Sequence, residues 1–102
     1  MKDAAEWLAR TSADFVVALR SNEGFRRDLF ERLVSALEDC AVEWAGRDCI
    51  PRLAANVLVE LVVSVQAAAD AYEGPLRQEI LDASYELFDL VVACVGVDAS
   101  DV

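Results

Sequence analysis

The stretch PRLAANVLVELVVSVQAAADAY, residues 51–72, decides the fold of this chain. Its apolar pattern continues for roughly 20 residues between Pro51 and Gly74, which is long for a β-strand but ordinary for a helix. Residues 57–65 are rich in β-branched side chains, which favours a buried strand. The length of the pattern outweighs that preference, and the stretch therefore predicts a long central helix.

This helix is apolar on two faces when its residues are placed about 100° apart around the axis. One face is an ordinary core stripe of Ala54, Leu58, Leu61, Val65, Ala68 and Tyr72. The opposite face carries Ala55, Val59, Val63, Ala67 and Ala71 at i, i+4 spacing, among Arg52, Asn56, Glu60, Gln66 and Asp70. An apolar ridge edged by hydrogen-bonding groups is typical of an interface. The alternative is the central helix of a small bundle, flanked by two others.

Turn and cap residues divide the rest of the chain into further helices. Asp3 followed by Glu6 has the form of a capping box, Gly46 is a C-terminal stop, and Gly74 with Pro75 marks the sharpest break. The predicted helices span about 4–19, 25–45, 51–72 and 76–95, and the acidic tail 97–102 is expected to fray. We therefore expect one all-α domain over residues 1–102, a compact, four-helix, bundle-like fold with short loops.

The last predicted helix has an apolar side and an acidic side. Its inward residues are expected to be Leu76, Ile80, Ser84, Leu87, Phe88, Val91 and Val95. Its outward residues Glu79, Asp82, Glu86 and Asp89 have no lysine or arginine at matching positions of the same helix. Such a face is commonly just solvated, but unpaired carboxylates also favour docking of a basic protein surface.

The charge balance disfavours several classes of partner. The chain has 19 acidic and 9 basic residues, which gives a net charge of −10. This sign repels the phosphates of nucleic acids and anionic membrane surfaces. The only candidate transmembrane segment, Leu53 to Ala69, is short and contains Glu60 near its middle, where a charge is unfavourable. We expect neither direct nucleic-acid binding nor a membrane span.

The residue types present limit the chemistry that the chain can perform. There is no histidine, so catalytic triads and zinc-finger sites cannot be built. Cys40, Cys49 and Cys94 form no CxxC pair, and only Cys49 falls in a predicted loop, where a thiol would be exposed. We assign no catalytic, cofactor-binding or metal-binding residue, and we expect a protein that is not an enzyme. A carboxylate-dependent enzyme or small-ligand binder would need a cavity near Glu60.

The function predicted from these features is protein binding. We expect a small acidic adaptor, regulator or inhibitor that forms a homodimer through the second face of helix 51–72. Its interface residues would be Ala55, Asn56, Val59, Glu60, Val63 and Ala67. The alternative is an acidic decoy, such as a toxin immunity protein or an inhibitor of a nucleic-acid-processing enzyme, with Glu79, Asp82, Glu86 and Asp89 as its docking face. The N-terminus lacks the layout of a secretory signal, so we expect a cytoplasmic location.

Overall fold

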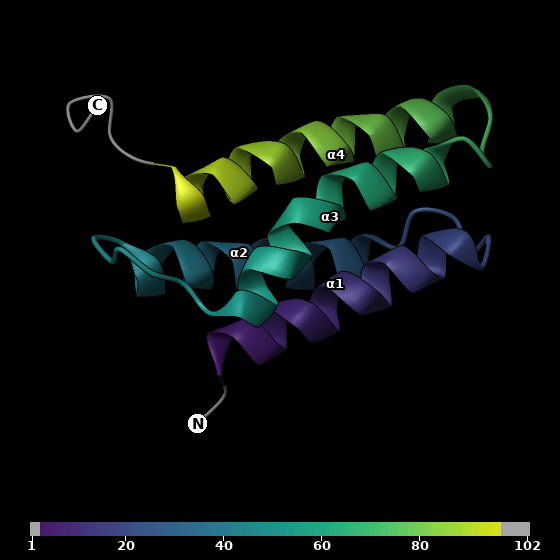
Figure 1. Cartoon of the computed structure of the whole chain (residues 1–102). Helices are drawn as coiled ribbons and strands as arrows, with labels where there is room; N and C mark the ends of the chain where they lie inside the picture. The colour runs from purple at the N-terminus through teal and green to yellow at the C-terminus, as the bar shows by residue number, and fades with distance from the viewer. Residues whose placement is uncertain (1–2, 97–102) are drawn as a thin grey trace.

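Four helices and no strands make up the regular structure of residues 3–96, the part of the chain that the computed structural model describes (Figure 1). They are α1 (Ala4–Arg20), α2 (Arg27–Trp44), α3 (Arg52–Ala69) and α4 (Gly74–Val95). The expected all-α fold is confirmed. The tail 97–102, for which we expected fraying, lies outside the described residues.

The helix ends follow the cap residues of the sequence. The Asp3 carboxylate accepts a hydrogen bond of 3.0 Å from the Ala5 amide and so caps α1. Gly46 and Gly74 take the left-handed backbone conformation, with φ of 77° and 63°, which glycine adopts without steric cost. Gly46 lies in the break after α2, and Gly74 is the first residue of α4.

α3 ends at Ala69, three residues earlier than the apolar pattern predicted. The amides of Asp70, Ala71 and Tyr72 instead bond to the carbonyls three residues before them, at 3.0 to 3.2 Å. This spacing tightens the final turn from α-helical to 3₁₀-type geometry. Tyr72 still reaches the core, where only 6% of it is exposed.

Each helix packs against two of the others. α1 packs against α2 and α3, and α4 packs against α2 and α3, whereas the backbones of α1 and α4 do not approach each other closely within the described part of the chain. Figure 1 shows α3 and α4 running antiparallel as one hairpin beside the hairpin of α1 and α2. The molecule measures 41 × 32 × 19 Å, and its shortest dimension is that of two helix layers of about 10 Å each. Every helix therefore retains an outer face.

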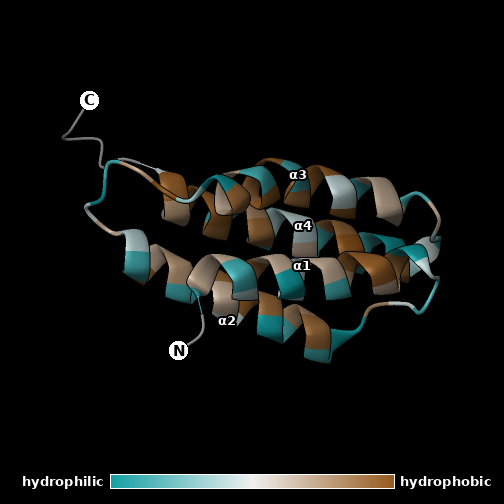
Figure 2. Ribbon diagram, turned by 60° about the horizontal axis from the view of Figure 1, so that its bottom comes forward, coloured by the Kyte–Doolittle hydropathy of each residue, from teal (hydrophilic) through white to brown (hydrophobic). Residues whose placement is uncertain are grey.

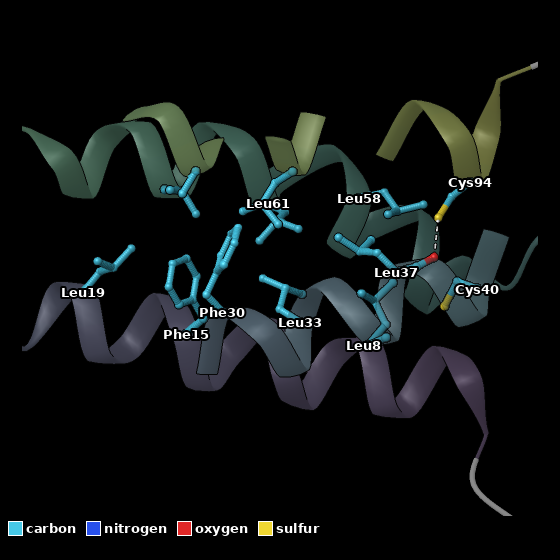
Figure 3. Packing of buried hydrophobic residues seen from close by; sticks show 14 of the residues in the cluster. Leu8, Phe15, Leu19, Phe30, Leu33, Leu37, Cys40, Leu58, Leu61 and Cys94 are labelled. Atoms are coloured by element: carbon cyan, nitrogen blue, oxygen red, sulfur yellow. Dashed lines mark hydrogen bonds between the residues drawn. The ribbon is translucent and has the colours of Figure 1, made fainter. Parts of the chain in front are cut away.

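The core lies between the two hairpins and is built from aliphatic and aromatic side chains of all four helices. Its largest fully buried members include Leu8, Phe15, Leu33, Leu37 and Leu61, which are labelled in Figure 3, and Ile80 and Leu87 of α4. Phe15, Phe25 and Phe30 form an aromatic cluster with ring centroids 5.3 to 5.8 Å apart, within the range of favourable ring packing. This cluster lies where α1 turns into α2.

Tyr72 ties the end of α3 to that same turn. Its hydroxyl donates to the Leu19 carbonyl at 2.8 Å and accepts from the Gly24 amide at 3.1 Å. Both bonds join segments about fifty residues apart in sequence. The side chain therefore links the two hairpins by hydrogen bonds as well as by packing.

Candidate functional site

The outer face of α3 is apolar and uncovered. The exposed fractions of Val59 and Val63 are 76% and 66%, and no other part of the described chain packs over them. Of the other predicted interface residues, Asn56, Glu60 and Ala67 are exposed and Ala55 is half-buried. All six residues therefore lie on one accessible side of the helix.

The neighbours of α3 do not hide this face. α1 and α4 flank the helix, as expected for a central helix, but Val59 and Val63 remain exposed between them. The buried residues of α3 are those of the core stripe together with Ala69. α3 is thus flanked by α1 and α4, as the alternative of a central bundle helix requires, and its second apolar face is left uncovered within residues 3–96.

α4 extends the apolar surface, which the sequence analysis missed. Phe88 and Val95 were expected to point inward, but they are 54% and 50% exposed. Tyr85 and Val92 are also exposed, at 56% and 45%. The inner side of α4 is already filled by Ile80, Ala83, Ser84, Leu87 and Cys94. Phe88 follows Leu87 directly, and adjacent helical residues are about 100° apart, so the two cannot share one narrow inner face.

The exposed side chains of α3 and α4 lie next to one another. The Gln66 side chain of α3 donates to the Ser84 hydroxyl of α4 at 3.3 Å, which fixes the register of the hairpin. Because the helices are antiparallel, Val63, about one turn before Gln66, lies level with Phe88, one turn after Ser84. We call Val59, Val63, Tyr85, Phe88 and Val92, which are all exposed, the α3–α4 apolar surface. Figure 2 shows that hydrophobic residues recur along the length of α3.

The predicted polar members of the interface border α1 instead. Asn56 and Glu60 line a shallow groove of about 250 Å³ between α1 and α3, together with Ser12, Val16 and other residues. Glu60 is exposed rather than enclosed. Glu60 therefore lies at the edge of the apolar surface. The groove that it lines is open to solvent and is not an internal cavity.

The acidic residues of α4 border a second groove, on the edge of α4 that faces α2. Glu79, Asp82 and Glu86 line this space of about 430 Å³. Its other lining residues are Phe25, Arg27, Phe30, Pro75, Gln78 and Ala83. Asp89, the fourth member of the predicted docking face, is exposed but does not line it. We call this space the acidic groove.

One cation enters the acidic groove from α2. The Arg27 guanidinium lies 3.3 Å from a Glu79 carboxylate oxygen and 5.3 Å from the centre of the Phe25 ring. The sequence pattern had shown no basic residue matched to the acidic face, because it considered α4 alone. Arg26, by contrast, pairs with Glu23 and Asp28, each at 3.0 Å, and this hydrogen bonding lowers the pKa of Asp28.

The thiols divide into two buried groups and one exposed group. Cys40 and Cys94 lie in the core, and burial raises the pKa of Cys40 to about 12 and raises that of Cys94 as well. The Cys94 thiol donates to the Leu37 carbonyl at 3.3 Å (Figure 3). Both are neutral at physiological pH and act as small apolar side chains. Cys49 is exposed, as its predicted loop position implied.

Comparison with known proteins adds no assignment to these surfaces. The chain matches no protein-family model, no curated protein and no solved structure. Within residues 3–96, no three histidine, cysteine or acidic side chains are grouped so that they could hold a metal ion. α3 has the length and composition of a membrane span, but the core helix of a soluble protein also meets this criterion. The two surfaces therefore have to be interpreted from their own chemistry.

Proposed function

We propose that this protein is a small cytoplasmic protein-binding module, a four-helix bundle that forms a homodimer through the α3–α4 apolar surface. The observation that supports this proposal is the exposure of Val59 and Val63 beside Phe88 and Val92. Contiguous exposed apolar side chains rimmed by polar groups mark interaction sites in soluble proteins. The domain is also small, so that covering this surface would add to a modest core.

The placement of the charged residues leaves the α3 face open to a second copy, although the net charge of −10 on each copy is repulsive. Glu60 is the only charged residue of α3 after Arg52, and it lies on the α1 side of the face. Glu79, Asp82 and Glu86 point to the opposite edge of α4, toward α2. Two copies meeting through α3 would therefore keep Glu79, Asp82 and Glu86 of one copy apart from those of the other.

The shape of the α3 ridge also suits a copy of itself. Ala55, Val59, Val63 and Ala67 repeat at i, i+4 spacing with small side chains. Rows of this spacing interdigitate when two helices cross at about −50°, the commonest packing in globular proteins. In a dimer with twofold symmetry, each copy contributes this same row of residues to the interface. Asn56 and Glu60 would then fix the register by hydrogen bonds at the rim.

Light scattering coupled to size-exclusion chromatography tests the dimer. We expect the parent protein to elute with twice its monomer mass at micromolar concentrations, and Val59→Glu to elute as a monomer. Each substitution appears twice in a twofold interface, and burying an unpaired carboxylate costs several kcal/mol.

Val42→Glu is the matched control, because Val42 is 80% exposed on α2, away from this surface. It should leave the mass unchanged. A parent protein that is monomeric at these concentrations, or a dimer that withstands Val59→Glu, contradicts the proposal.

A further inference from the structure

The acidic groove contains more negative charge than its own cation neutralises. It is lined by three carboxylates, Glu79, Asp82 and Glu86, and by one basic residue, Arg27. Arg27 pairs with Glu79, and Asp82 accepts a hydrogen bond of 2.8 Å from the neutral Gln78 amide. The lining therefore has a charge of −2 when its residues are ionised. A cation placed beside Asp82 and Glu86 would relieve their mutual repulsion.

The groove also has an apolar floor that suits a planar cation. Phe30 is buried and Phe25 half-buried, and both line it beside Pro75 and Ala83. Arg27 lies over the Phe25 ring while it contacts Glu79, so the geometry of the groove accommodates a guanidinium, and in the parent protein Arg27 itself occupies this part of it. Arginine gains more than lysine from such a site because its planar group stacks on aromatic rings and forms paired hydrogen bonds with carboxylates.

We propose that the acidic groove binds an arginine side chain presented by a basic segment of a partner protein. Its volume of about 430 Å³ exceeds what one guanidinium fills and leaves space for the neighbouring part of a peptide. The net charge of −10 repels nucleic acid and a second copy of this chain but attracts a basic protein. This inference does not depend on self-association, because the groove and the α3–α4 apolar surface lie on opposite edges of α4.

A labelled hexa-arginine peptide tests the proposal by fluorescence anisotropy at low salt. Replacing both Asp82→Asn and Glu86→Gln should weaken binding about tenfold, since an exposed ion pair contributes up to about a factor of five. The control is Glu6→Gln with Asp14→Asn, which changes the total charge equally on the outer face of α1. Because no residue of α1 lines the acidic groove, the control should weaken binding less than twofold. Equal weakening by the two pairs would mean diffuse attraction and would overturn the proposal.

Arg27 gives a second test with the opposite sign. Arg27→Gln leaves Glu79 and the Phe25 ring free to contact the peptide, so it should tighten peptide binding. The control is Arg10→Gln, which makes the same charge change on the exposed side of α1. We expect the effect of Arg27→Gln to be severalfold larger than that of the control. Hexa-lysine should bind the parent protein more weakly than hexa-arginine. If both arginine variants tighten binding equally, or if hexa-lysine and spermine bind as well as hexa-arginine, the groove is not an arginine site.

Discussion

At the residue scale, Tyr72 illustrates how one polar atom can join distant parts of a small fold. Its hydroxyl lies between the Leu19 carbonyl and the Gly24 amide, in a position where the side chain is only 6% exposed. An intramolecular hydrogen bond contributes a net stability of about 1 kcal/mol, and a buried group left without its partner costs more. Since the α1–α2 turn meets the end of α3 here, both hairpins depend on this side chain.

We predict that Tyr72→Phe lowers the free energy of unfolding by about 1 to 3 kcal/mol, as measured by urea denaturation. The phenyl ring remains, so the loss isolates the hydroxyl. Tyr85→Phe is the control at protein concentrations where only monomer is present, because Tyr85 is then 56% exposed on the outside of α4 and its hydroxyl can bond to water. A change in Tyr72→Phe no larger than in Tyr85→Phe would mean that the two hydrogen bonds add nothing.

At the element scale, the spacing of apolar residues in the sequence predicts that α3 has two apolar faces. It does not predict which of these faces a neighbouring helix covers. The core stripe of α3 and its exposed ridge both follow from the positions of its apolar residues in sequence. Phe88 was misplaced because the apolar band of α4 is broad, and periodicity alone does not mark its edge. Arg27 and Glu79 are 52 residues apart, and their pairing depends on the packing of α2 against α4, which no local pattern encodes.

Two valines of α3 allow the burial of its two faces to be compared by experiment. The same valine-to-alanine substitution can be made on the inner face and on the outer face. Val65→Ala should lower the free energy of unfolding by about 2 kcal/mol, since it removes two buried methyl groups from a fully buried site and leaves a cavity. Val63→Ala, at a site 66% exposed, should change it by less than about 0.5 kcal/mol. Urea denaturation should be performed at protein concentrations where only monomer is present. Equal losses would show that the outer face of α3 is packed against the chain itself.

At the scale of the whole molecule, the two candidate surfaces respond to salt in opposite ways. A homodimer brings together two copies with a net charge of −10 each, which repel one another outside the apolar contact. Binding of a basic segment in the acidic groove is attractive over the same range. The Debye length falls from about 30 Å at 0.01 M salt to about 3 Å at 1 M, so both long-range effects disappear as salt is added.

We therefore predict that raising the salt concentration from 0.01 M to 1 M strengthens self-association and weakens binding of hexa-arginine. Sedimentation equilibrium measures the first and fluorescence anisotropy the second. Apolar burial is not screened, so removing the repulsion leaves the dimer more stable, whereas the ion pairs at Asp82 and Glu86 lose their attraction. A dimer that dissociates at 1 M salt would show that ion pairs, rather than Val59, Val63 and Phe88, hold it together. The dimer interface would then be a charged surface and not the α3–α4 apolar surface.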